Sequence, residues 1–373
     1  MQRIGKIVII VLLWAIVGGY IFYFHSRAHH HRTTTLVHSV EVNILDSLRD
    51  AMLVTSDAVM KWIVRSGVPT LGVPIAEVDL AAIEHNIRQN GFIERASAYV
   101  TYTGELQVEV SQRQPLMRLM VDGYDCYITE QGHIFPAPRS ASAYVPIVTG
   151  SYTPPVPADY MGSVKEYIDG MVASSQAYAD TLQYEKVPLF EFSEKLSDSV
   201  RSVRRMQVER KGWLGGFKGP FEDYDEFDAR VEAKREEKAQ LRRALRYLER
   251  ENNKRIDAVS RRQQAEVEKQ KKLLKRYEDF LKLINFVKYL EEDSFWRAEI
   301  VQIVASTMSS GDLRIDLIPR TGNHRVRFGR VENVEAKLDK LLAFYQNGLS
   351  NIGWDSFRTI SVEYHGQVVC TKN

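Results

Sequence analysis

The hydrophobic pattern begins with one unbroken apolar run over residues 7–24. Coiled as a helix, this run spans about 27 Å, close to the roughly 30 Å hydrocarbon core of a bilayer. It is longer than the apolar region of a cleavable signal peptide and ends in four aromatic residues that suit a membrane interface, although Ser26 and Ala28 keep cleavage as the competing interpretation. We predict a single transmembrane helix that leaves the N-terminal tail in the cytoplasm.

In the next segment the spacing of the apolar residues changes twice, from that of a strand to that of a helix and back. Residues 40–44 alternate as a strand, and two amphipathic helices follow at 55–66 and 80–90, with Thr55 and Asp79 placed to cap them. The period then falls to two on either side of Thr103-Gly104, which predicts a hairpin. Strand, two helices and hairpin is the order of the small POTRA module.

A second, β-rich unit starts after this module. Strands are predicted at 116–121, 124–129 and 134–135, separated by the turn pairs Asp122-Gly123 and Gln131-Gly132. Short helices and strands are predicted again near the C-terminus. They are a helix through 295–301, strands at 313–318 and 326–329, a helix at 334–347, and two final strands at 359–364 and 367–370.

Between these two β-rich parts lies a long helical pattern. Three prolines at 151–160 indicate a linker, and residues 221–293 then contain neither proline nor glycine while about half of them are charged. Acid-before-base pairs at i,i+4 spacing, such as Glu251 with Arg255, support a helix. Its apolar positions fit a coiled coil, which Asn252-Asn253 could fold into an antiparallel hairpin; an isolated solvated helix is the alternative. Whether the insertion reaches out to a partner or covers the β domain stays open.

The predicted fold class is α+β. The predicted organisation is a cytoplasmic tail (1–6), a transmembrane helix (7–24), a linker (25–38), a POTRA domain (39–112), and a β domain in two parts (113–150 and 283–373) around a helical insertion (151–282).

Composition and motifs favour binding over catalysis. The chain is 44% hydrophobic with a formal charge of +2, so its charge indicates neither nucleic acid nor an acidic substrate. It lacks the metalloprotease, serine-hydrolase, phosphate-loop and Cys-x-x-Cys motifs, and His29 to His31 lie in a connector where they have no rigid partner. Cys126 and Cys370 are too few for a disulfide scaffold, and whether they are oxidised stays open. We therefore expect no catalytic residue, cofactor, metal or small-molecule substrate.

The end of the chain offers a binding surface of its own. A final strand of a β-rich unit often lies at a sheet edge, where unpaired backbone groups can accept a strand from another protein. Val368-Val369 supplies the β propensity. An interior position for this strand is the competing interpretation.

Several segments resemble the bacterial cell-division family FtsQ/DivIB, in its Bacteroidetes-type form. Near the first hairpin these are Asn90-Gly91-Phe92-Ile93 and Gln112-Arg113-Gln114-Pro115-Leu116; later come Leu317-Ile318-Pro319-Arg320, Gly353-Trp354 and Gln367-Val368-Val369-Cys370. Their order, together with the apolar run, carries the resemblance over about two thirds of the chain. The long insertion departs from the family's usual connection, so nothing about its role transfers.

The resemblance implies a non-enzymatic divisome scaffold. It would be a single-pass inner-membrane protein, collected at midcell, whose periplasmic domains recruit septal proteins. The family's last strand accepts a strand from an FtsB-type partner in a complex that also contains an FtsL-type protein, and the POTRA domain serves other divisome components. Carried onto this chain, the accepting edge is Gln367, Val368, Val369 and Cys370, with Trp354 and Tyr364 nearby.

A second class of protein shares several of these features. Periplasmic adaptors of efflux pumps also combine one N-terminal anchor with a helical hairpin inserted in a β-rich body. The helix pair before the first hairpin, and the lack of a duplicated half-motif around the insertion, argue against them.

Overall fold

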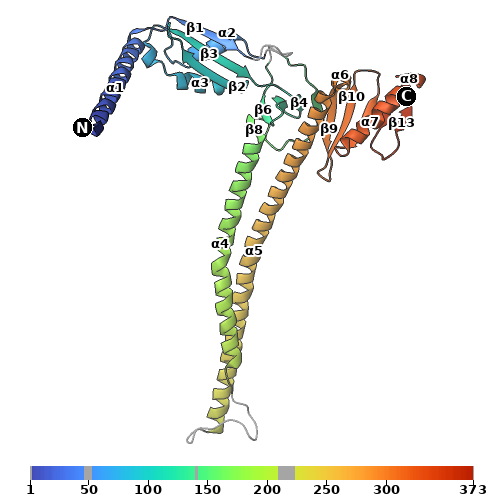
Figure 1. Ribbon diagram of the computed structural model, residues 1–373. Coiled ribbons are helices and arrows are strands. Elements are labelled where there is room, and N and C mark those ends of the chain that lie inside the picture. Colours follow the sequence, from blue (N-terminus) through green and yellow to red (C-terminus); the bar gives the residue numbers. More distant parts are fainter. Residues whose placement is uncertain (1, 46–52, 139–141, 209–222, 373) are drawn as a thin grey trace. The chain divides into compact units, whose positions relative to one another are not determined.

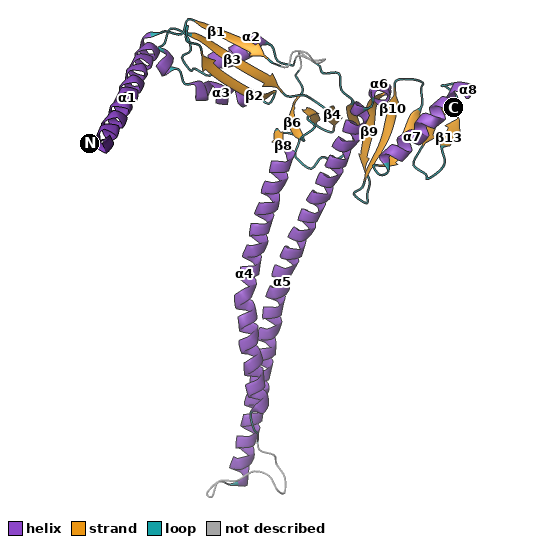
Figure 2. Cartoon of the chain, viewed as in Figure 1, coloured by secondary structure: helices purple, strands orange, loops and turns teal. Residues whose placement is uncertain are grey.

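The structure is a computed structural model, and it describes residues 2–45, 53–138, 142–208 and 223–372, with the side chains of 2–12 and 351 outside the description. The chain divides into two compact units (Figures 1 and 2). Unit 1 comprises Met1–Glu166 and Tyr277–Asn373, and unit 2 comprises Tyr167–Arg276.

The N-terminal helix α1 runs over Gln2–Thr34 and contains the predicted span. The first part of that span, 7–12, lies outside the described side chains. Within the part of the chain that the structure describes, no helix combines the length and apolar character needed to cross a membrane. The anchor at 7–24 therefore stays a prediction.

The predicted linker at 25–38 is helical over most of its length, which corrects the expectation of an irregular connector. His31 stacks on the Tyr102 ring, with centroids 3.9 Å apart, and its Nε2 lies 2.9 Å from the Tyr102 carbonyl oxygen. The Thr35 hydroxyl lies 3.1 Å from His31 Nδ1. These contacts hold the end of α1 on the turn after β2 (Ile93–Val100) and explain why polar residues here are ordered.

The module after α1 has the predicted order. It consists of β1 (Ser39–Ile44), α2 (Ser56–Arg65), the short 3-10 helix η1 (Ile75–Glu77), α3 (Leu80–Arg88), β2 and β3 (Glu105–Gln112). β3 is central, parallel to β1 and antiparallel to β2. Thr55 and Asp79 cap the two helices, accepting hydrogen bonds from the backbone N–H groups of Ala58 and Ala82. Alternate residues of β3 are buried, among them Leu106 and Val108, and form one core with residues of α2 and α3.

The β-rich part is one ten-stranded sheet in the order β13-β12-β11-β10-β9-β7-β4-β5-β6-β8. Its strands before the insertion are β4 (Met117–Val121), β5 (Tyr124–Ile128), β6 (His133–Pro136), β7 (Ile147–Ser151) and the two-residue β8 (Gly162–Ser163). Those after it are β9 (Ile300–Thr307), β10 (Leu313–Pro319), β11 (Arg325–Arg330), β12 (Phe357–Ser361) and β13 (Val369–Lys372). Helices α6 (Ser294–Glu299), α7 (Val334–Phe344) and α8 (Ser350–Ile352) and the π-helical turn η2 (Tyr345–Leu349) complete this part.

β9 was not predicted. The helical pattern was extended to residue 301, but α6 ends at Glu299 and the chain turns at once into a strand. The residues that follow, Ile300, Val301, Ile303 and Val304, are β-branched, which favours a strand. β9 lies beside β7 and parallel to it, with Val148 opposite Ile303, so the chain that leaves β7 returns to the sheet next to it after β8 and the insertion.

The insertion is built from two long helices, α4 (Val164–Arg205) and α5 (Tyr224–Glu292). α4 was not recognised in the sequence, because Pro188 and Gly170 interrupt its pattern of helix-forming residues. α5 also continues past the predicted boundary at 282, and its last turns bury Phe280, Ile284 and Val287 in unit 1.

The prediction of a hairpin turn at Asn252-Asn253 is wrong. α5 runs through both residues, and the connection to α4 falls between Arg205 and Tyr224, largely outside the described residues. Asn252 is buried at 4% exposure, and its Nδ2 donates a hydrogen bond to the Leu189 carbonyl oxygen of α4 at 2.9 Å. A buried asparagine at such a seam fixes the register of two helices, rather than breaking one of them.

We predict that Asn252→Asp loosens the hairpin, because a buried carboxylate would face the Leu189 carbonyl oxygen with no proton to donate. A penalty of about 1–3 kcal/mol corresponds to local amide exchange that is roughly fivefold to a hundredfold faster. Hydrogen exchange over residues 185–195 and 248–256 measures it. Asn252→Leu, which continues the apolar seam of Leu245 and Val259, is the matched control and should leave exchange near the wild-type rate. Equal protection in the aspartate variant would contradict the register role.

Candidate functional site

The C-terminal strand β13 lies at one end of the ten-stranded sheet. It is antiparallel to β12, with Ser361 opposite Val369 and Ile360 opposite Cys370. On its other side no strand among the described residues pairs with it. The edge position that the sequence pattern favoured is thus the one that the fold adopts.

The predicted site residues fall at different places around this edge. Val369 and Cys370 belong to β13, whereas Gln367 and Val368 precede it, so the strand begins two residues later than predicted. A turn at Gly366, whose φ of 71° favours glycine, comes directly before Gln367 and Val368, which belong to no strand. Thr371 and Lys372 complete the strand and were not predicted, although the β-branched Thr371 gave a weak signal.

The exposed side chains at this edge differ in character. Val369 is 44% exposed and Tyr364, in the connecting loop, is 52% exposed. Cys370 is half-buried beside Ile360, and this burial raises the pKa of its thiol. The edge therefore presents an apolar side chain and an aromatic ring next to its backbone groups.

The loop between β12 and β13 is held from α7. Lys340 Nζ donates hydrogen bonds to the carbonyl oxygens of Val362, at 2.8 Å, and Tyr364. Desolvation lowers the pKa of Lys340, and the two carbonyl oxygens compensate in part for its lost hydration. These bonds fix the point from which β13 starts.

Trp354 lies in an aromatic cluster rather than on the edge strand itself. Its ring packs edge-to-face on Tyr345, with centroids 5.3 Å apart. The Tyr345 hydroxyl pairs with His324 Nε2 at 3.0 Å, and burial raises the pKa of Tyr345 and lowers that of His324. Both groups therefore stay neutral at pH 7, and the cluster is a rigid support of half-buried and buried rings.

The two cysteines are both free thiols. Cys126 is buried in β5, where desolvation raises the pKa of its thiol to about 12. Six strands separate β5 from β13 in the sheet, a distance on the order of 30 Å, which is far beyond the reach of a disulfide.

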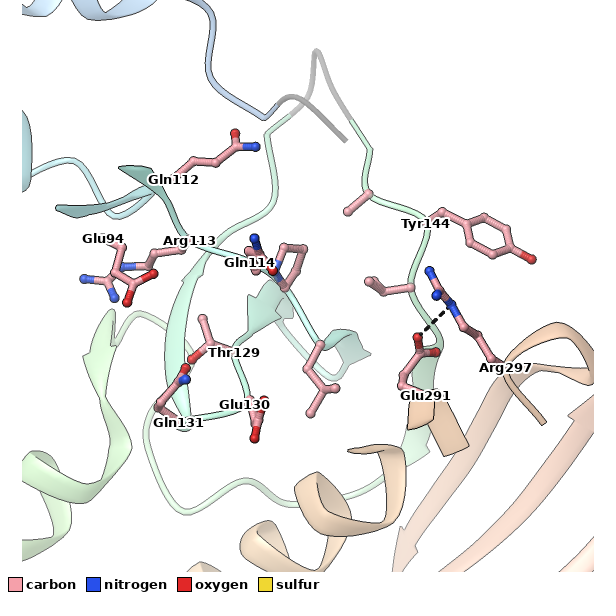
Figure 3. A pocket seen from close by; sticks show the side chains of 14 residues that line it. Glu94, Gln112, Arg113, Gln114, Thr129, Glu130, Gln131, Tyr144, Glu291 and Arg297 are labelled. Atoms are coloured by element: carbon pink, nitrogen blue, oxygen red, sulfur yellow. Dashed lines mark ion pairs between the residues drawn. The ribbon is translucent and has the colours of Figure 1, made fainter. Parts of the chain in front are cut away.

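A polar cleft of about 690 Å³ lies elsewhere in unit 1, between the N-terminal module and the start of the β sheet (Figure 3). Four of its five charged side chains are engaged: Glu291 and Arg297 form an ion pair at 3.3 Å, Arg113 Nε donates to the Gly91 carbonyl oxygen at 3.1 Å, and Glu130 binds Lys288. Burial raises the pKa of Glu291 and lowers that of Arg113. No cysteine, serine or histidine lines this cleft, and no cluster among the described residues could hold a metal ion.

Comparison with known families gives two matches along the chain. Residues 35–111 match the POTRA-like domain, and residues 243–371 match the family described as FtsQ/DivIB, C-terminal related. No curated protein matches the chain. The second match includes β13 and the C-terminal part of α5 from residue 243, and the first covers the module of β1 to β3. The two matches, in this order and on this α+β fold, support an FtsQ/DivIB-type protein.

Proposed function

We propose that this protein is a membrane-anchored scaffold of the cell-division machinery that captures a partner by strand addition at β13. The family relationship supports the scaffold role in cell division. Residues 7–24 anchor the chain in the inner membrane, with the tail cytoplasmic and the body periplasmic, and the protein gathers at midcell during division. It acts by binding rather than by transforming a substrate.

The observation that carries the proposal is the edge position of β13 within the region that matches the FtsQ/DivIB-related family. An added strand would meet the backbone groups on the side of β13 away from β12. Each new backbone hydrogen bond contributes about 0.5–1.5 kcal/mol net, so a strand of four residues gives modest affinity. Contacts with the exposed Val369 and Tyr364 side chains would add specificity.

The partners that fit this mode are septal membrane proteins of the FtsB and FtsL type. The FtsB-type protein supplies the extended segment that pairs with residues 367–372. Other divisome components bind through the module of β1 to β3. Lys372 at the strand's end favours a partner with an acidic residue and discourages unspecific pairing between edges.

Val369→Pro is expected to abolish capture of the partner, because proline removes a ladder donor and its ring obstructs pairing. A pull-down with the soluble segment of an FtsB-type protein measures the loss. Val369→Thr is the matched control, since it keeps both the N–H group and the β-branched shape. Protease resistance of all three chains establishes that the fold persists. Undiminished capture by the proline variant would refute strand addition at this edge.

A fluorescent fusion of the full chain is expected to collect at midcell in dividing cells. This distribution separates the division scaffold from the efflux-pump adaptor, which the hairpin of α4 and α5 inserted in a β-rich body also resembles. An adaptor would be spread uniformly over the envelope. Such a uniform pattern, with the fusion intact on a blot, would contradict the division role.

A further inference from the structure

The two helices of unit 2 carry opposite charges on their outward faces. The side of α4 that faces α5 includes Leu182, Leu189 and Leu196, and the corresponding side of α5 includes Leu245, Asn252 and Val259. Residues on the opposite side of each helix are exposed and follow a spacing of three and four. Two acidic side chains on the outward side of α4 contact their own helix: Asp198 pairs with Arg201 at 3.4 Å, and Asp180 accepts a hydrogen bond from Gln176 Nε2 at 3.0 Å.

On α4 the outward positions form a continuous stripe with acidic ends and an apolar centre. We call it the acidic stripe, and it consists of Asp180, Tyr184, Val187, Glu191, Glu194 and Asp198. All six are exposed, and Tyr184 is 77% exposed. A tyrosine and a valine left in solvent on the outward side of a helix indicate a surface that a partner covers.

On α5 the outward positions form a stripe of the opposite sign. This basic stripe consists of Arg243, Tyr247, Arg250, Lys254 and Arg261, interrupted by Asp257. Tyr247 is 65% exposed. Lys254 contacts Glu251 at 2.7 Å, an exposed pair three residues apart that contributes little and can rearrange.

The acidic stripe and the basic stripe lie at the same level along the long axis of the hairpin. Asn252 bonds Leu189, Arg262 pairs with Glu185 at 3.0 Å, and Lys238 Nζ donates to the Met206 carbonyl oxygen at 2.5 Å. Because the helices are antiparallel, these contacts place Glu191, Glu194 and Asp198 within the height spanned by residues 243–254. The acids of one stripe are therefore level with the bases of the other.

We propose that the hairpin binds the hairpin of a second copy of this chain, side by side and in the same orientation, with the acidic stripe of one against the basic stripe of the next. The new contact between α4 and α5 is antiparallel, like the one within each hairpin. It pairs carboxylates with guanidinium and ammonium groups and covers Tyr184, Val187 and Tyr247. The complementarity within one chain identifies the occupant as another copy.

The geometry also determines the form of the assembly. The two stripes lie on opposite sides of the hairpin, so each copy that joins leaves one stripe of each kind free. A head-to-tail contact of this kind joins successive copies into an open row. Where the rotation from one copy to the next adds up to a full turn, it joins them into a closed ring instead. The inference concerns unit 2 and does not depend on the proposed use of β13.

Sedimentation velocity of the full chain in detergent tests the proposal. The wild-type chain is expected to form concentration-dependent dimers and larger species, and these should dissociate as salt is raised, since added ions screen exposed charges. Glu191→Lys with Glu194→Lys should weaken association at least tenfold, and so should Arg250→Glu with Lys254→Glu. Mixing the two variants should restore it, because each then offers the other a complementary stripe.

Glu237→Lys with Glu249→Lys is the matched control. It makes the same change in net charge as the acidic-stripe variant, at exposed positions on the flanks of α5. Association should stay within twofold of wild type, and helical content by circular dichroism should be equal in all variants. A wild-type chain that is monomeric at every concentration and at low salt would overturn the proposal, as would stripe variants that associate normally or a control that fails with them.

Cross-linking in cells adds an independent readout. In a Cys370→Ser background, cells that co-express a Glu194→Cys chain and an Arg250→Cys chain should yield a disulfide-linked pair. A single chain carrying both cysteines cannot close this bond internally, because the two positions lie on opposite outward faces. Absence of the linked pair, with both chains present in the membrane fraction, would count against the contact.

Discussion

The parallel pairing of β7 with β9 is the interaction on which the rest of unit 1 depends. It joins two parts of the sheet that are separated in sequence by the whole insertion, and five registered residue pairs hold it. Parallel neighbours require a long crossover, and here the crossover contains β8, α4, α5 and α6. The insertion can therefore be long without breaking the sheet, because β7 and β9, which lie before β8 and after the insertion in sequence, are neighbours. Gly150 allows the close approach, since a Cβ there would lie 2.2 Å from the Ala305 carbonyl oxygen.

The same constraint gives β13 its position. The strands after the insertion add outward from β9 in the order β10, β11, β12 and β13, so the last strand of the chain is also the last of the sheet. α7 and the aromatic cluster of Trp354, Tyr345 and His324 then support the loops around it. β13 is a short edge strand and carries Lys372, which limits the aggregation hazard of an unpaired strand.

The helical insertion is stabilised in a different way from the β sheet. It has a narrow apolar seam in a highly charged sequence, so its stability depends on contacts between α4 and α5 at defined heights, including Asn252 with Leu189 and Lys186 with Gln263 at 2.6 Å. A seam of this kind uses only one side of each helix. Charged side chains on the opposite sides form the acidic stripe of α4 and the basic stripe of α5.

Local sequence determined the elements whose signals are local. The caps at Thr55 and Asp79, the hairpin around Gly104 and most strands of the β-rich part could be predicted because they depend on neighbouring residues and on alternation. Tertiary structure decided the rest. α4 is a helix despite Pro188 because α5 packs along it, Asn252 lies inside a helix because a carbonyl of α4 accepts its amide, and Val369 lies at an edge because the strand order leaves no described strand beyond β13. Each of these outcomes depends on a partner far away in sequence, which no local pattern contains.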